Sequence, residues 1–389
     1  MAERAVETIS VETLRRGGSA DPDAARAVAE LHRQIAGPDI ACVLIFCAAS
    51  YDRAALSDAL ARHFGDTPVY GCTTAGEITP FGYISGGISG IAFPAAEFRV
   101  AAMLFQTLSQ FDTAATVAGT RALVAELDAP VPGRRALHPS RRFAMLLIDG
   151  LSVREEQLVS AVGNTLAGVP LLGGSAGDGL DFGTCHVLHR GGFVTDGAVL
   201  LLFETARRFS VFKTEHFIPS DRKMVVTGAD LERRRVYEIN GEPAALEYAQ
   251  LLGLGGQPLS PRVFAAHPVM VRVGGQYHVR AIQRVNPDNS LTFFCAIDEG
   301  LVLTLAESVD ILENLHELFA RLDHEVGEPD LVIGCDCVLR NLELEERQLK
   351  RAVSRLFVER RVVGFCTYGE QYMSMHVNQT LTGIAIGAR

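Results

Sequence analysis

One short pattern occurs twice in full and once in part, and it constrains the fold more than any other feature of the chain. Residues 70–93 read YGCTTAGEITPFGYISGGISGIAF, and residues 363–386 read VGFCTYGEQYMSMHVNQTLTGIAI. Both contain a glycine, a Cys-Thr pair, a Gly-Glu pair, an irregular stretch and a Gly-Ile-Ala strand. Residues 172–178, LGGSAGD, form a weaker copy, in which Gly177-Asp178 stands where the others have Gly76-Glu77 and Gly369-Glu370. We infer that this strand-to-loop corner is the repeating unit of the fold.

The segments around each corner repeat as well. Each corner follows an apolar strand, a helix with apolar residues at four-residue steps, and a second strand; the three copies begin near residues 40, 143 and 330. Matched repeats of about 40 residues indicate one structural unit. A strand–helix–strand unit predicts two parallel neighbours joined by a right-handed crossover. Strand-like segments then follow the corners, so we predict an α/β (mixed α+β) fold with two lobes, repeated β-α-β units and mixed sheets flanked by helices on one side.

The length and composition indicate a large globular protein. A chain of 389 residues is long for one core, and residues 209–328 show a different pattern, with a hairpin turning at Gly274-Gly275. We therefore predict two domains, 1–208 and 209–389. One helix is expected over residues 342–358, before the last corner.

Charge and apolar runs exclude several classes of partner. The net charge of −10 argues against nucleic acid and against an acidic membrane surface. The first ten residues lack the apolar core of a signal peptide, and the longest apolar runs fall short of the roughly 18 residues of a membrane span. We expect a cytoplasmic protein whose eight cysteines are free thiols or ligands.

The corners are the first candidates for a binding site. The loop at the carboxyl end of a parallel strand faces a crevice where ligands commonly bind. A simpler interpretation is that the corner glycines adopt positive φ in tight turns while the acids cap backbone amides. Convergence of three corners favours a site, and Arg280 is added because an arginine between apolar neighbours needs an anion or a carboxylate. The predicted ligand-binding residues are Cys72, Thr73, Thr74, Glu77, Ser175, Asp178, Arg280, Cys366, Thr367 and Glu370.

The last corner also carries side chains that bind metals. Cys335 and Cys337 lie two apart on one strand, so both face the same side, and Cys366 lies on the next strand. Three thiolates with His376 would suit zinc or iron, although buried free cysteine is also common as a small apolar residue. A catalytic cysteine at position 72 or 366 lacks any local nucleophile signature. Tyr372, Met375 and His376 are residue types that ligate haem iron.

The sequence resembles the FIST family, whose members carry adjoining FIST N and FIST C domains. The segments GCTTAGEI and LLGGSAGD look like landmarks of the N domain, and VYEINGEPAALEYAQLLG, HPVMVRVGGQYHVRAI and VVGFCTYGEQ look like those of the C domain. The resemblance implies a FIST N-like domain over 1–208 and a FIST C-like domain over 209–389. It also implies a sensory, ligand-binding role in signal transduction, with small ligands such as amino acids.

More narrowly, the ending MHVNQTLTGIAIG makes the chain similar to the nitric-oxide-sensing FIST proteins. That similarity implies a haem b cofactor, a partner histidine kinase, and His376 as the candidate ligand of the iron. One alternative is a FIST sensor of a small polar metabolite such as an amino acid, and another is a cysteine-dependent enzyme. We expect a sensor rather than an enzyme, and the oligomeric state, a homo-oligomer included, is left open.

Overall fold

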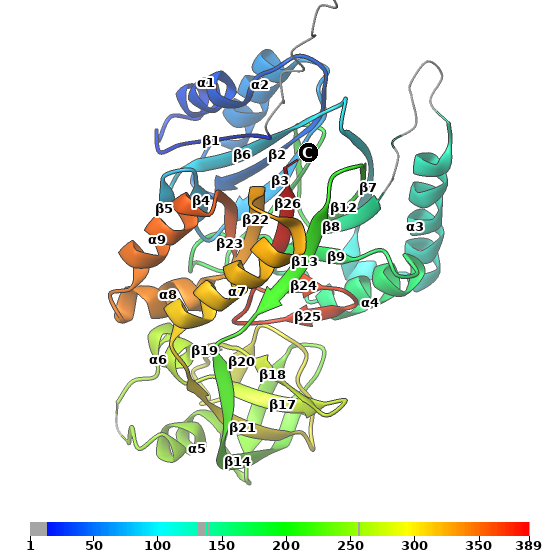
Figure 1. Ribbon diagram of the computed structural model, residues 1–389. Coiled ribbons are helices and arrows are strands. Elements are labelled where there is room, and N and C mark those ends of the chain that lie inside the picture. The colour runs from blue at the N-terminus through cyan, green and yellow to red at the C-terminus, as the bar shows by residue number, and fades with distance from the viewer. Residues whose placement is uncertain (1–13, 131–136, 138–140, 256, 389) are drawn as a thin grey trace, which may run out of the picture.

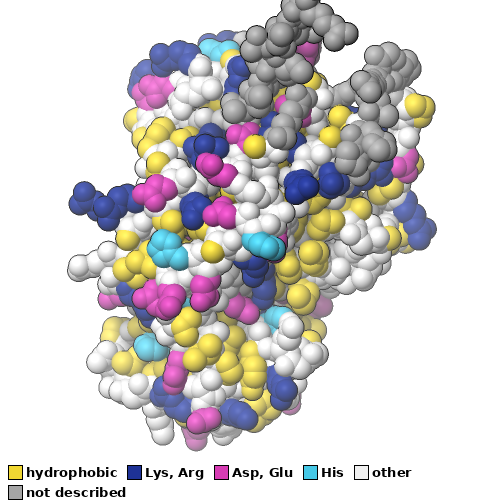
Figure 2. All heavy atoms as spheres, in the orientation of Figure 1, with side chains coloured by type: hydrophobic (Ala, Val, Ile, Leu, Met, Phe, Trp, Pro, Cys, Tyr) yellow, Lys and Arg dark blue, Asp and Glu magenta, His cyan; other side chains and the backbone are white. Residues whose placement is uncertain are grey.

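A computed structural model describes residues 14–130, 137, 141–255 and 257–388. Figure 1 shows a core of sheets with helices on its outside, and a smaller lobe below it. The predicted α/β class, with mixed sheets flanked by helices, is confirmed. No helix of the described residues is long and apolar enough to cross a membrane. On the face shown in Figure 2, basic and acidic side chains are interspersed over both core and lobe.

Three six-stranded sheets of the core have the same organisation. Each contains an outer strand, a returning strand, a parallel pair and a short hairpin, in that order. The parallel pairs predicted from sequence, β2–β3, β8–β9 and β22–β23, are confirmed. The first sheet contains β1 (Arg15–Ser19), β6 (Ile88–Pro94), β2 (Ile40–Ala48), β3 (Val69–Thr74), β10 (Val187–His189) and β11 (Gly192–Val194). The second contains β7 (Phe98–Gln106), β12 (Gly197–Thr205), β8 (Arg141–Ile148), β9 (Leu171–Ser175), β24 (Glu370–Tyr372) and β25 (Met375–Val377). The third contains β13 (Phe209–Thr214), β26 (Leu381–Gly387), β22 (Pro329–Cys337), β23 (Val362–Thr367), β4 (Glu77–Thr79) and β5 (Gly82–Ile84).

The hairpins are exchanged in a cycle between the three repeats. The hairpin that follows β3 joins the third sheet by pairing β4 with β23. The hairpin that follows β23 joins the second sheet through β24 and β9, and the one that follows β9 joins the first sheet through β10 and β3. Each repeat therefore completes the sheet of another repeat.

The helices lie on the outer face of each sheet. Helices α1 (Ala24–Ile35) and α2 (Arg53–Phe64) cover the first sheet, α3 (Thr113–Asp128) and α4 (Glu155–Thr165) the second, and α7 (Ile311–Val326) and α9 (Lys350–Glu359) the third. Side chains of Asp23, Asp52, Asp112 and Asp310 accept hydrogen bonds from amides of the first turn, as N-caps do. The single helix expected over 342–358 is instead two helices, α8 (Val338–Glu346) and α9. The chain is broken between them at Gln348, which has a φ of 57°.

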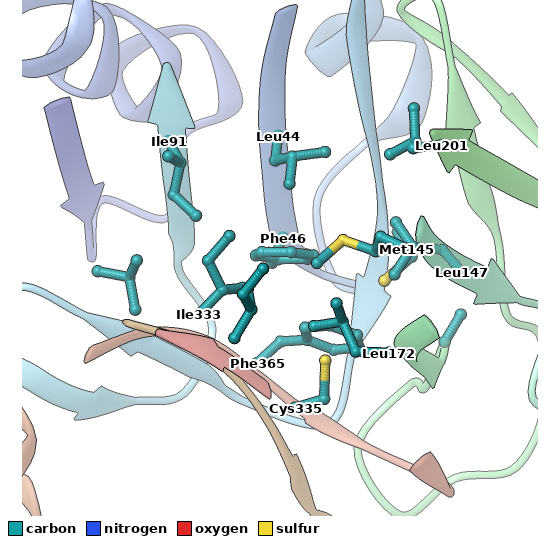
Figure 3. Packing of buried hydrophobic residues seen from close by; sticks show 14 of the residues in the cluster. Leu44, Phe46, Ile91, Met145, Leu147, Leu172, Leu201, Ile333, Cys335 and Phe365 are labelled. Atoms are coloured by element: carbon teal, nitrogen blue, oxygen red, sulfur yellow. The ribbon is translucent and has the colours of Figure 1, made fainter. Parts of the chain in front are cut away.

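The inner faces of the three sheets share one apolar core. Leu44 and Phe46 point inward from β2, whereas their neighbours Val43 and Ile45 point outward to the helices. This alternation explains why the strand is a continuous apolar run. Figure 3 shows side chains of all three repeats directed toward one another, and the ring of Phe46 stacks on that of Phe365 at 4.4 Å.

The lobe is inserted in the third repeat, between β13 and α7. It has its own apolar core and one eight-stranded sheet, and it contains the hairpin predicted at Gly274-Gly275. The division of the chain after residue 208 stays a prediction. The strands of the lobe are β14 (Phe217–Asp230), β15 (Arg235–Ile239), β16 (Glu242–Pro243), β17 (Val269–Val273), β18 (Gln276–Arg280), β19 (Ile282–Val285), β20 (Leu291–Phe293) and β21 (Val302–Ser308); its helices are α5 (Ala244–Leu251) and α6 (Pro261–Ala266).

The first corner requires a glycine at position 71, because the paired strand β2 leaves no space there for a side chain. A Cβ on Gly71 would lie 1.6 Å from the carbonyl oxygen of Ile45. We expect Gly71→Ala to lower the free energy of unfolding by roughly 1–3 kcal/mol or more, because the backbone of β2 must move. Gly192→Ala is the matched control, since its nearest atom would be 3.6 Å away. Urea unfolding measures both, and equal stabilities would contradict the packing described here.

Candidate functional site

The three corners meet at the carboxyl ends of the parallel pairs. Backbone hydrogen bonds join them in a closed ring, in which each repeat donates to one neighbour and accepts from the other. The convergence expected of the corners is therefore present in the backbone itself. The bonds run from the amide of Ala75 to the carbonyl of Cys366 (2.9 Å), from Tyr368 to Ser175 (3.3 Å), and from Gly177 to Thr73 (3.0 Å).

This ring corrects the alignment of the second corner. Gly177 occupies the place of Ala75 and Tyr368, so Asp178 matches a glycine of the other corners and not Glu77 or Glu370. The close glycines agree, because Gly71, Gly173 and Gly364 each face a carbonyl oxygen of the paired strand within 2 Å of an added Cβ. The sequence alignment placed the aspartate one residue away from its structural position.

Glu77 and Glu370 close their corners in the same way. One carboxylate oxygen of each accepts from a threonine three residues earlier, Thr74 at 2.5 Å and Thr367. The other oxygen accepts from an amide ten residues later, that of Gly87 at 2.9 Å or of Thr380 at 3.2 Å. These carboxylates therefore fasten the ends of the exchanged hairpins, the capping role considered from the sequence.

Burial dominates the titration of both carboxyls. Removal from water raises the pKa of Glu77 to about 7 and that of Glu370 to about 8, although the hydrogen bonds that each accepts lower it. The two groups therefore change charge near neutral pH.

Asp178 holds a different loop. Its carboxylate accepts from the amides of Phe182 (2.9 Å), Gly183 (2.7 Å) and Thr184 (2.7 Å), and it also accepts from the hydroxyl of Tyr368 in the third corner. The loop 178–184 is thus ordered by one side chain and is tied to another repeat.

A hollow of about 520 Å³, here called the corner cavity, opens beside the first corner. It contains three of the residues predicted from sequence, Thr74, Glu77 and Asp178. Sequence reasoning missed Arg53 and Asp181, because each lies on a loop or helix end without a motif. The position of Arg53 at the start of the helix after β2 was the available signal, since that end faces the corner. The lining residues are Ala48, Ala49, Ser50, Arg53, Thr74, Ala75, Gly76, Glu77, Ser85, Gly86, Asp178, Gly179, Asp181, Gly183 and Thr184.

The other predicted ligand-binding residues do not line this cavity. Cys72 packs in the shared core, and Thr73 exchanges hydrogen bonds with the backbone of His186. Ser175 accepts from the side chain of Gln371 at 3.1 Å, and Arg280 lies half-buried on β18 in the lobe. Thr367 donates to the carboxylate of Glu370, a side-chain contact here called the clasp of the third corner, and Cys366 is buried.

The cysteines of the third repeat lie on opposite faces of its sheet, and burial disfavours the reactive thiolate form of Cys72 and Cys366. Cys335 pairs with Phe365, and Cys366 pairs with Asp336, so Cys366 points to the opposite face of the sheet from Cys335 and Cys337. Among the described residues no group of three or more His, Cys, Asp or Glu could hold a metal ion. Burial raises the pKa of Cys72 and Cys366, which keeps both thiols protonated at neutral pH.

The haem-ligand candidates lie on the exchanged hairpin β24–β25. His376 is buried. Its Nδ1 lies 3.4 Å from the side-chain amide nitrogen of Gln371, and its Nε2 lies 3.4 Å from the backbone carbonyl oxygen of Phe294. Tyr372 is half-buried, whereas Met375 is exposed. Tyr372 and Met375 pair across this hairpin and share one face, His376 lies on the other face, and none of the three lines the corner cavity.

The raised pKa of Glu370 predicts a pH-dependent stability. The carboxyl of Glu370 has a pKa of about 8 in the folded protein, against an ordinary value of 4.5. Its contribution to the free energy of unfolding is therefore complete below pH 4.5 and is lost as pH rises through about 8. We expect Glu370→Gln to reduce this fall in the free energy of unfolding by up to about 1.4 kcal/mol per pH unit. Urea unfolding from pH 5 to 9 measures it, with exposed Glu317→Gln as the control. Unchanged slopes in Glu370→Gln would count against the assignment.

Comparison with known protein families finds two domain models in the chain. A model of the FIST N domain matches residues 41–242, more than half of the chain, and a model of the FIST C domain matches residues 244–373. A comparison with curated proteins gives no significant match. The chain therefore belongs to the FIST family, whose domains are sensory modules of signal transduction that bind small ligands.

Proposed function

We propose that the protein senses a small polar ligand, of the amino-acid type, that binds in the corner cavity. The observation that carries this proposal is the meeting of Arg53 with Asp178 and Asp181 around one hollow whose other lining residues, apart from Glu77, are small. A volume of about 520 Å³ falls within the range of small-molecule sites.

The charges around the cavity suit a zwitterion. Arg53 is the first residue of α2, and its guanidinium offers the planar pair of donors that fits a carboxylate. The amino end of the helix adds a partial positive charge on the same side. Asp178 and Asp181 supply negative charge for an ammonium group, and the hydroxyls of Ser50, Ser85 and Thr184 supply further polar partners.

The signal would pass through the loop 178–184. Its order depends on the carboxylate of Asp178, which also accepts from Tyr368 of the third repeat. A ligand that contacts this loop and Arg53 together favours the arrangement that forms both contacts, and the population of that arrangement rises on binding. A partner histidine kinase, proposed from the resemblance, would read the change at the surface.

Substitution of Arg53 tests the cavity directly. We expect at least one amino acid to raise the stability of the wild type by about 2.7 kcal/mol at 100 times its dissociation constant, and Arg53→Ala to abolish most of that rise. Arg62→Ala, an exposed arginine at the other end of α2, is the matched control. Thermal unfolding with the twenty amino acids measures the effect. The proposal fails if no amino acid stabilises the wild type, or if Arg53→Ala responds as the control does.

Haem binding and nitric-oxide sensing stay proposals that rest on the resemblance and on the residue types of Tyr372, Met375 and His376. The candidate ligands fit haem poorly as they lie, because both nitrogens of His376 have neighbours at 3.4 Å. A larger cavity of about 710 Å³ is lined at its described residues by Ala96, Glu97, Leu137, Arg141, Ala206, Arg207, Arg208, Val326, Gly327, Glu328 and Ala388, which offer no axial ligand.

A haem titration separates the two proposals. If His376 ligates the iron, the purified chain will develop a Soret band that His376→Ala removes and Met375→Leu retains. If no band forms, or if His376→Ala leaves it unchanged, the haem assignment to this residue is wrong, while the amino-acid response remains to be judged by Arg53→Ala alone.

A further inference from the structure

A second hollow, of about 190 Å³, lies at the seam between the core and the lobe. We call it the seam pocket. The core contributes the loop that follows β8 and the residue Phe182, and the lobe contributes β15, β19, β20 and their ends. Its lining residues are Gly150, Leu151, Val153, Phe182, Arg233, Arg234, Gln283, Arg284, Thr292, Phe293 and Phe294.

The seam pocket occupies the same place in the second repeat as the corner cavity in the first. Ser175 and Thr73 are equivalent in the ring of backbone bonds. Ile148 pairs with Ser175, and Cys47 pairs with Thr73. Residues that follow these strand positions line the two hollows, at 150–151 and at 48–50. The fold therefore forms a hollow at this point twice, and in the second repeat the lobe covers it.

Three of the residues that line the seam pocket have a left-handed backbone conformation. Val153, Phe182 and Arg234 have φ values of 57°, 51° and 50°, and all three line it. Positive φ is costly for a β-branched residue such as valine. Such residues cluster at ligand sites, where the surrounding structure holds them in place.

The charged residues that line the pocket are all arginines. The guanidinium of Arg234 is buried and lies 2.5 Å from both Glu155 and Glu156, two carboxylates that do not line the pocket and that occupy this arginine. Arg233 is exposed and has only Asp230, at 3.6 Å. Arg284 is exposed and has no ion-pair partner in the described part of the chain. The two exposed arginines leave positive charge available to an anion.

We propose that the seam pocket binds a small carboxylate with an apolar body. The guanidinium groups of Arg233 and Arg284 would hold the carboxylate, and the partly exposed side chains of Leu151, Val153 and Phe182 would contact the apolar part. The rings of Phe182 and Phe294 lie 5.7 Å apart, one from the core and one from the lobe. The volume of about 190 Å³ limits the ligand to a compact molecule.

Binding would fix the lobe against the core. Two contacts already cross the seam beside the pocket: the amide of Ala296 donates to Glu156 at 2.6 Å, and Arg234 joins the same helix end. A ligand held by both sides adds a third contact, so it favours the docked arrangement of the lobe.

Isothermal titration with benzoate tests the proposal. We expect benzoate to bind the full chain, and the double variant Arg233→Gln/Arg284→Gln to bind at least tenfold more weakly. The matched control is Arg222→Gln/Arg272→Gln, which removes two exposed lobe arginines that do not line the pocket. Arg53→Ala should leave benzoate binding unchanged, which separates this site from the corner cavity.

Hydrogen exchange supplies a second readout. Benzoate should slow exchange of the Ala296 amide in the wild type and in the control, and should not do so in the double variant. The proposal is overturned if benzoate fails to bind, if the double variant binds as the control does, or if inorganic phosphate binds at these arginines while benzoate does not.

Discussion

The exchange of hairpins between repeats is the constraint on which the rest of the structure depends. A β-α-β unit alone leaves the outer edge of its second strand unpaired. The free N–H and C=O groups of such an edge can pair with another chain and so promote aggregation. Here β4, β10 and β24 each cover that edge in a different repeat. The three sheets must therefore form together, and their inner faces must enclose one core.

Two buried glutamates close the loops from which two of the exchanged hairpins leave. Glu77 and Glu370 each join the end of a parallel strand to the end of the departing hairpin, and each is buried at a cost that raises its pKa. The second corner has no such glutamate and uses Asp178, which orders a loop and accepts from Tyr368. The repeat that departs from the common clasp is thus the one whose loop reaches the first corner's cavity.

Local patterns in the sequence predicted the β-α-β units, the mixed sheets and the positions of most helices, because burial and periodicity are local properties. The cyclic exchange could not be predicted, since a short strand such as 77–79 carries no mark of which edge it pairs with. The one-residue shift at Asp178 is visible only from the backbone bonds between corners, and the break at Gln348 depends on a positive φ that glutamine rarely adopts. In the corner cavity, Thr74, Glu77 and Asp178 were found through the repeated corner, whereas Arg53 carries no motif and was missed. The lobe residues that line the seam pocket could be identified only from the tertiary arrangement.

The corner cavity is lined by the first and second repeats, and it includes the residue that begins the strand β4 of the third sheet, which gives a physical reason for the sensing proposed there. Arg53 belongs to the first repeat, Asp178 and Asp181 belong to the second, and Glu77 opens the hairpin that completes the third sheet. Under the proposed function, a ligand in this cavity would stabilise one relative arrangement of three units that are already coupled through a ring of backbone bonds. The seam pocket is connected to these backbone bonds through Phe294, whose aromatic ring lies 5.6 Å from that of Tyr368, a residue of the third corner. Tyr368 in turn donates to Asp178, so the lobe and the corner cavity share one chain of contacts.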